Sequence, residues 1–209
     1  MSNFRIDDAN VENYHKEGFI IFDKPVFAPE KFQRLVSIFE ELEANKAEGK
    51  RSDELDAPHF SDPRLFEFLM SDDILDLVEP LIGPNIGLWA SHFITKEPLI
   101  GRATPWHEDS SYWKGRLDRM DQIVTVWLAI DRSDRENGCM RVIPGTHHDG
   151  FSEYEEVDKA ENTFASEIRA DLIDDDKAVY FELDPNHCSL HDGRIIHGAT
   201  ANPSPRRRA

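Results

Sequence analysis

Chemically active side chains gather in one nonapeptide, PWHEDSSYW at residues 105 to 113. His107 and Asp109 stand two residues apart within it. Side chains at i and i+2 share one face of a strand, so we expect the two to project together. Such a pair could belong to a surface turn, supply two ligands of a zinc or iron site, or form half of a catalytic dyad. A third partner elsewhere in the chain would favour the metal site.

A third ligand is available in LHDGRIIHGAT, residues 190 to 200. His197 comes directly before a glycine at the end of an apolar strand pattern, which is where a ligand at a barrel mouth is expected. Two histidines and one carboxylate, with three coordination positions open, match the facial triad of non-heme Fe(II) oxygenases. We therefore predict that His107, Asp109 and His197 bind a metal. His191 would share their strand face, as a hydrogen-bonded core histidine or as a residue behind the ligands.

Three consecutive arginines, Arg206, Arg207 and Arg208, follow this segment. As a bare charge cluster they would be a solvated tail. The sequence Asn-Pro-Ser-Pro at residues 202 to 205 instead predicts a turn that brings them back alongside the His197 strand. Arg206 and Arg208 would then share one face. An inward arginine could bind the distal carboxylate of a keto-diacid whose other end chelates the metal.

The elements that must position these residues change character at Gly83-Pro84. The first 83 residues read mostly as helix, a helical buttress, and the predicted pieces are a helix from Asp7 or Asp8 to Gly18, a strand at 19–22, a longer helix from Pro29, and helices at 63–70 and 73–83. Residues 84–209 predict strands at 86–95, 122–131, 139–144, 177–183 and 188–198. This order favours one α+β domain over residues 1–209, mainly β, with a barrel or jelly roll behind flanking helices.

The composition limits the class of partner. A chain of 209 residues with 41 acidic and 24 basic residues carries a net charge of -17, which disfavours nucleic acid and anionic membranes. Cys139 and Cys188 make neither a disulfide framework nor a zinc knuckle, which suits a reducing cytoplasm. With neither an apolar signal region nor a long apolar stretch, we expect a cytoplasmic protein without a membrane span. The sequence leaves the oligomeric state open.

Aromatic and histidine residues near the predicted ligands are candidates for a substrate pocket. Tyr112 and Trp113 follow Asp109 directly, so at least one should form a pocket wall, unless both pack under a loop. His92 lies in the expected strand at 86–95, which could turn it inward as easily as outward.

Residues between the expected strands favour loops. His147 and His148 are interpreted as loop residues rather than ligands, and Asn137-Gly138 as a hairpin corner. The acidic stretch from 152 to 176 has no clear period, so it predicts a long loop with some helix over the sheet or its mouth. We expect this stretch to act as a mobile cover.

The segments taken together resemble the phytanoyl-CoA dioxygenase family of Fe(II)/2-oxoglutarate oxygenases. The resemblance is carried, in the family's order, by FITKEP (93–98), PWHEDSSYW (105–113), VTVWLAID (124–131), ENGCMRVIPGTHH (136–148) and LHDGRIIHGATANPSPRRR (190–208). It implies a double-stranded β-helix, a jelly-roll or cupin-like core, with His107, Asp109 and His197 on iron. It also implies that Arg208 binds the 2-oxoglutarate carboxylate, with Arg206 as the alternative, and that Lys96 and Trp127 help line that site.

The activity that the resemblance implies is hydroxylation of an unactivated C–H bond in a small-molecule substrate, with Fe(II), 2-oxoglutarate and O2. Asp109 favours hydroxylation over halogenation, because related halogenases carry a small residue in its place. The alternative is a metal-binding β-barrel with a different function, such as a zinc or manganese isomerase or hydrolase, or a ligand-binding module.

Two departures from the family pattern concern the end of the chain. Many relatives have serine two residues after the distal histidine, where this chain has Ala199 next to Thr200. The family also continues past the arginine into a final barrel strand. We therefore expect the sequence up to Ala209 to lack the last strand of the barrel.

Overall fold

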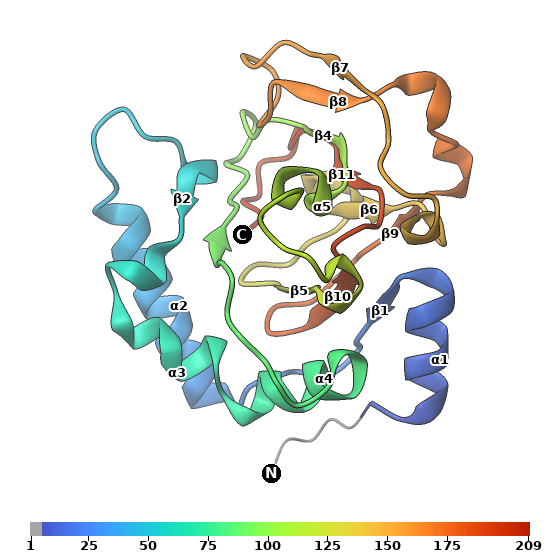
Figure 1. Ribbon diagram of the computed structural model, residues 1–209. Coiled ribbons are helices and arrows are strands. Elements are labelled where there is room, and N and C mark those ends of the chain that lie inside the picture. Colours follow the sequence, from blue (N-terminus) through green and yellow to red (C-terminus); the bar gives the residue numbers. More distant parts are fainter. Residues whose placement is uncertain (1–5) are drawn as a thin grey trace.

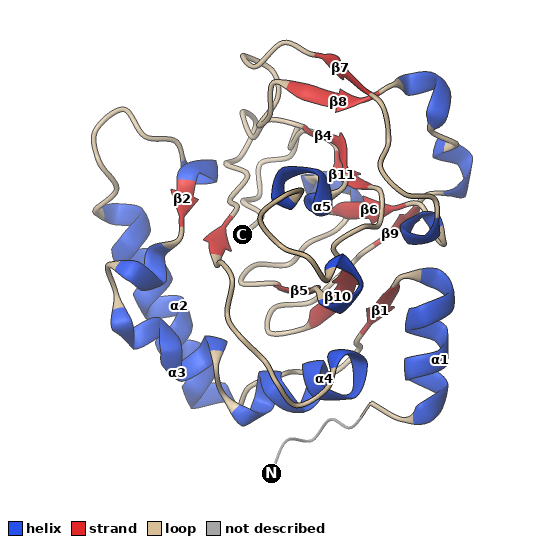
Figure 2. Ribbon diagram, viewed as in Figure 1, coloured by secondary structure: helices blue, strands red, loops and turns tan. Residues whose placement is uncertain are grey.

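Residues 6–209 are described by a computed structural model in which helices lead and strands follow (Figures 1 and 2). The helices are α1 (Asp8–Glu17), α2 (Pro29–Ala44), α3 (Phe66–Leu69), α4 (Asp72–Ile82) and α5 (Asp109–Trp113). The strands are β1 (Phe19–Ile21), β2 (Leu55–Asp56), β3 (His92–Phe93), β4 (Thr104–His107), β5 (Val124–Leu128), β6 (Met140–Val142), β7 (Tyr154–Glu156), β8 (Ser166–Ile168), β9 (Val179–Tyr180), β10 (Cys188–Asp192) and β11 (His197–Ala199). The fold is α+β, as predicted. Across this range, no helix is long and apolar enough to cross a bilayer.

The first helix begins and ends where the sequence predicts. The Asp7 carboxylate accepts the backbone N–H of Asn10 at 2.8 Å, and Gly18 ends α1 with a left-handed φ of 87°. A Cβ added at Gly18 would lie 2.6 Å from Nδ1 of His147, so a side chain there would also clash with the turn at 146–148. The chain can therefore pass directly from α1 into β1.

Two antiparallel sheets position the candidate site. Their strand orders are β1-β10-β5 and β4-β11-β6-β9, and β2-β3 and β7-β8 form two smaller pairs. Side chains of the two main sheets meet in one apolar cluster, in which Met140 and Val142 of β6 pack with Phe19 of β1 and Trp127 of β5. The two sheets therefore share a core.

The N-terminal helices cover the other face of the first sheet. Leu190 and Cys188 of β10 are fully buried in a large cluster with helical residues such as Phe39 and Leu77. Because strand side chains alternate, His191 on the same strand faces the opposite way, toward the second sheet. The helical buttress thus covers the apolar face of β10, and polar residues such as His191 lie on its other face.

Three expected elements differ from the structure. The strand expected at 188–198 is two strands in different sheets, because a turn closed by the Ile195 N–H to Asp192 O bond at 3.0 Å separates β10 from β11. The expectation that His191 and His197 share one strand face is therefore wrong. The strand expected at 86–95 is only β3, and the stretch 152–176 contains the β7-β8 hairpin.

Asn186 ties the segment before α2 to the turn that precedes β10. Its side chain accepts the N–H of Phe27 at 3.0 Å and donates to the Phe27 carbonyl at 2.8 Å, and its φ is 68°. We predict that Asn186→Ala lowers the free energy of unfolding by about 2 to 4 kcal/mol, from two lost hydrogen bonds and left-handed strain. Asn186→Gly, which keeps the φ, should lose less. Urea denaturation measures both, and equal losses would show that strain contributes nothing.

Candidate metal centre

The two histidines of the triad are brought together by strand pairing. His107 is the last residue of β4, and its partner across β11 is His197. Their ring centroids are 4.1 Å apart, and both side chains are buried. Gly198 allows this approach, since a Cβ there would lie 3.0 Å from the Thr104 carbonyl oxygen. The register therefore fixes two imidazoles side by side.

Asp109 joins them from a different element than expected. We predicted that it shares the His107 strand, but β4 ends at His107 and Asp109 is the first residue of α5. Its Oδ1 lies 3.7 Å from Nε2 of His107 and 3.8 Å from Nε2 of His197. An ion bonded at about 2.0 to 2.2 Å to each atom would span those separations. The three residues, whose ligand atoms all lie within 4.8 Å of one another, thus fit one metal ion.

Backbone contacts set the tautomer of both imidazoles. Nδ1 of His107 is 2.8 Å from the Pro105 carbonyl, and Nδ1 of His197 is 3.0 Å from the Ile195 carbonyl. A carbonyl only accepts, so each Nδ1 carries the proton and each Nε2 keeps a lone pair for a metal. Burial, helped by the neighbouring His107, also lowers the pKa of His197 to about 3. Of the two, His197 is therefore held as a neutral ring, as a metal ligand must be.

The second oxygen of Asp109 is held from the first sheet. Thr125 Oγ1 donates to Asp109 Oδ2 at 3.2 Å, and His191 Nε2 lies 3.8 Å from the same oxygen. Neither ring nitrogen of His191 has a hydrogen-bond partner among the described residues, although the side chain is buried. The expectation of a hydrogen-bonded core histidine is therefore wrong. His191 stands behind the ligands, its ring centroid 4.8 Å from that of His197.

Arg208 is a buried cation without an acidic partner. It is 2% exposed, its Nη1 donates to the Ile94 carbonyl at 3.1 Å, and its Nε has no hydrogen-bond partner. None of the ion pairs among the described residues includes it. Burial lowers its pKa to about 10, so it stays protonated at neutral pH. An unpaired buried charge is costly, so the site favours an anion that comes from outside the chain.

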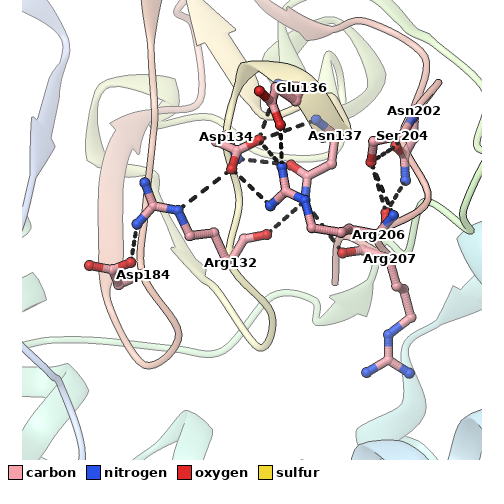
Figure 3. Close-up of polar contacts among 9 residues, drawn as sticks. All are labelled: Arg132, Asp134, Glu136, Asn137, Asp184, Asn202, Ser204, Arg206 and Arg207. Atoms are coloured by element: carbon pink, nitrogen blue, oxygen red, sulfur yellow. Dashed lines mark hydrogen bonds and ion pairs between the residues drawn. The ribbon is translucent and has the colours of Figure 1, made fainter.

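The other two arginines have acidic partners, and Figure 3 shows Arg206 beside Asp134 and Glu136. Arg206 binds Asp134 at 2.9 Å and Glu136 at 2.9 Å and is partly exposed, while Arg207 binds Asp131 at 2.7 Å and also Glu40. The expectation that Arg206 and Arg208 share a face is wrong, because a bend at 204–206 breaks the strand alternation. Arg208 alone of the three is turned inward.

Asn202 organises the turn that returns the chain (Figure 3). Its amide donates to the carbonyls of Arg206 at 2.7 Å and Lys96 at 3.1 Å, and its Oδ1 accepts the Ser204 N–H at 3.0 Å. Arg208 then pairs with Lys96 through backbone bonds of 2.7 and 3.0 Å. The predicted turn is thus confirmed, and its polar side chains fix where Arg208 lies.

A family model described as "Phytanoyl-CoA dioxygenase (PhyH)" matches residues 14–209. The chain belongs to the phytanoyl-CoA dioxygenase family. A "Probable phytanoyl-CoA dioxygenase" of Caenorhabditis elegans is 30% identical over 193 residues, covering 87% of this chain and 60% of that protein. The human "Phytanoyl-CoA dioxygenase, peroxisomal" is 30% identical over 146 residues, covering 68% of this chain and 42% of its own length. The chain thus spans less than two thirds of these relatives.

A solved structure shows that the family fold is shared more widely. The crystal structure of EvdO2 from Micromonospora carbonacea, complexed with 2-oxoglutarate, superposes with a TM-score of 0.80 at 22% identity, covering 100% of this chain and 90% of that one. At this identity the likeness concerns the fold. The chain therefore has the fold of a protein that was crystallised with 2-oxoglutarate.

Two residues that the family resemblance predicted for the cosubstrate lie beside Arg208. Trp127 has its ring centroid 5.5 Å from the Arg208 guanidinium carbon. Lys96 is buried, and its ammonium donates to the carbonyls of Arg102 at 2.7 Å and Thr200 at 2.6 Å. Burial lowers the pKa of Lys96 well below its usual range. Lys96 thus ties the chain after β11 in place, and its role toward a cosubstrate stays a prediction.

The predicted pocket residues fall at different distances from the triad. The Tyr112 ring centroid is 6.1 Å from that of His107, whereas Trp113 packs against the chain at Gly193. His92 is exposed on β3, where it pairs with Asp56 at 2.8 Å, and it is not brought to the triad. Phe164 was not among the predicted pocket residues, although its ring centroid is 4.9 Å from that of His107. A lone aromatic in an acidic stretch carries no local signal.

We predict that His197→Ala weakens Co(II) binding more than about 100-fold, since even residues behind a ligand contribute 10- to 100-fold. Cobalt is a suitable probe because imidazole and carboxylate bind it. Isothermal titration measures the affinity, and circular dichroism should show an unchanged fold, because the triad is not part of the apolar clusters. His92→Ala is the control. Equal binding by His197→Ala and wild type would remove His197 from the site.

Proposed function

We propose that the protein is an Fe(II)- and 2-oxoglutarate-dependent dioxygenase that hydroxylates an unactivated C–H bond of a small molecule. The observation that carries the proposal is that the chain holds both a two-histidine, one-carboxylate triad and a buried Arg208 that has no acidic partner among the described residues. The family membership and the shared fold with a 2-oxoglutarate-bound protein support it. We also propose that the two main sheets form a double-stranded β-helix, supported by their common apolar cluster.

Each residue has a defined task in this reaction. Bound iron with 2-oxoglutarate supplies the oxidation: one O2 and one 2-oxoglutarate give succinate and CO2, and one oxygen atom enters the substrate C–H bond. His107 and His197 bind through Nε2, and Asp109 through the oxygen that faces them. Arg208 binds the distal carboxylate of 2-oxoglutarate, with Trp127 packed against its guanidinium.

Domain organisation and compartment stay predictions, and the oligomeric state stays open. We retain one domain over residues 1–209 and a cytoplasmic location, although relatives named peroxisomal exist in human and mouse. The proposed partner is a small-molecule substrate, and the net charge of -17 disfavours nucleic acid. A screen of candidate substrates by succinate release would identify the substrate class.

A zinc or manganese isomerase or hydrolase could use the same triad, but it would leave Arg208 without an anionic ligand. Anaerobic Fe(II) with 2-oxoglutarate should give the weak visible charge-transfer band of the chelate, and succinate should form when O2 is admitted. If the wild-type protein binds Fe(II) but gives neither band nor succinate, the dioxygenase proposal is wrong and the alternative is favoured.

Arg208→Ala should weaken 2-oxoglutarate binding by about two or more orders of magnitude. Two charge-assisted hydrogen bonds of roughly 1.5 to 3 kcal/mol each would be lost, at 1.4 kcal/mol per factor of ten. Arg208→Lys should recover only part, because an ammonium lacks the planar fork. Titration of the charge-transfer band measures the affinity. Arg206→Ala and Arg207→Ala are matched controls that should change it little, since both side chains already bind acidic residues of the chain. If Arg208→Ala binds 2-oxoglutarate as tightly as the wild type, Arg208 does not bind its distal carboxylate.

Asp109→Gly should abolish hydroxylation while part of the metal affinity remains, because two imidazoles still bind and one coordination position opens. The measurement is hydroxylated product from the substrate that the succinate screen identifies, alongside Co(II) titration. Gain of chlorination in the presence of chloride is a further outcome to assay. Undiminished hydroxylation would show that Asp109 is not a ligand.

A further inference from the structure

The β7-β8 hairpin lies along the strand that carries the first metal ligand (Figure 1). Thr163, between the two strands, donates its N–H to the Ala103 carbonyl at 2.9 Å, just before β4. Ile168 of β8 and Tyr154 of β7 pack in an apolar cluster with Trp106 of β4. The hairpin, which we call the cover (residues 152–168), therefore has a defined seat on β4.

One side of the cover reaches the triad directly. The Phe164 ring meets the His107 ring edge to face at 4.9 Å and lies 5.5 Å from the Tyr112 ring. Tyr112 is in turn 6.1 Å from His107 and is 43% exposed. A molecule that approaches the triad past Tyr112 therefore meets the cover.

The other side of the cover is held by Glu108, the residue between the two ligands His107 and Asp109. Its carboxylate is 1% exposed and accepts the Ser152 N–H at 2.7 Å and the Ser152 hydroxyl at 2.9 Å. None of the ion pairs among the described residues includes Glu108. Ser152 thus supplies the hydrogen bonds that offset the burial of this carboxylate.

The Glu108 peptide is held by the cover as well. Its N–H donates to the Tyr154 hydroxyl at 3.1 Å, and that hydroxyl donates to Ser111 Oγ at 3.0 Å. Ser111 Oγ then donates to the Glu108 carbonyl at 2.8 Å, which closes a ring of hydrogen bonds. The cover therefore forms hydrogen bonds with both the backbone and the side chain of Glu108, which lies between His107 and Asp109 in the chain.

We propose that Glu108 is a positioning residue that couples closure of the cover to the geometry of the metal ligands. When Ser152 and Tyr154 hold Glu108, His107 and Asp109 are held at the separation the metal requires, and Phe164 is seated against His107. The inference rests on the proposed metal site, and it adds that the cover and the site order together.

Coupling between two binding events is reciprocal, so it can be measured from both ends. If closure of the cover favours the metal-binding arrangement, metal must favour closure by the same factor. Typical coupling factors are about 5- to 150-fold, and we take about tenfold, within that range, as the expected size here. If these contacts only stabilised the fold, removing them would leave the metal affinity unchanged, and bound metal would not alter hydrogen exchange in the cover.

The test uses the whole chain and Co(II). Hydrogen exchange of residues 152–168 should slow about tenfold when Co(II) binds the wild type. In Ser152→Ala/Tyr154→Phe, which replaces no triad residue, the Co(II) dissociation constant should rise about tenfold and the metal-dependent slowing should disappear. Ser152→Ala alone, which removes one hydroxyl, gives the same test at smaller amplitude if the double variant does not fold.

Glu153→Gln is the matched control. It lies on the same segment and loses only a surface ion pair with Arg169, so both readouts should match wild type. The proposal is overturned if the double variant binds Co(II) like wild type, or if bound Co(II) leaves exchange in the cover unchanged. A wild type that binds no metal would instead overturn the metal site itself, and with it this inference.

Discussion

The antiparallel register of β4 with β11 is the constraint on which the candidate site depends. It sets His107 opposite His197, so that both imidazoles face the interior. A slip of one residue would turn one of them to the other face of the sheet. Gly198 permits the close approach, and the carbonyls of Pro105 and Ile195 orient the rings. Asp109 can therefore complete the triad from α5, outside the sheet, with Thr125 holding its free oxygen.

The second requirement is a buried positive charge, and the return of the chain after β11 supplies it. Asn202 and Ser204 shape the turn, and Arg206 binds Asp134 (Figure 3). Arg207 likewise binds Asp131, whereas Arg208 is buried. The buried polar side chains of Asn202 and Ser204 and the acidic partners of Arg206 and Arg207 thus determine the direction of the Arg208 side chain. The three arginines have separate roles although they are consecutive.

Residue types and spacing predicted that His107, Asp109 and His197 come together, and they predicted the turn at 202–205 and the order of the main elements. They did not predict that Asp109 begins a helix, because a strand and a helix start both bring residues 107 and 109 close. The same patterns predicted one strand where the structure has β10 and β11. Nothing in Asp192-Gly193 by itself shows that the chain leaves one sheet there and enters the other. Glu108, Thr125 and Phe164 carry no local signal. Their roles depend on contacts between segments distant in sequence, which no single-sequence pattern reports.

The charge of the molecule and the charge of the site have opposite signs, and distance decides which one an anionic ligand meets. The net charge of -17 is spread over the chain and is screened beyond about 8 Å at physiological ionic strength. Arg208 is buried, so its attraction for a carboxylate acts where water screens it little. With a pKa of about 10 it keeps its charge at neutral pH. A dianion is therefore repelled as it comes close to the acidic surface but attracted once it reaches Arg208, so salt should accelerate its association.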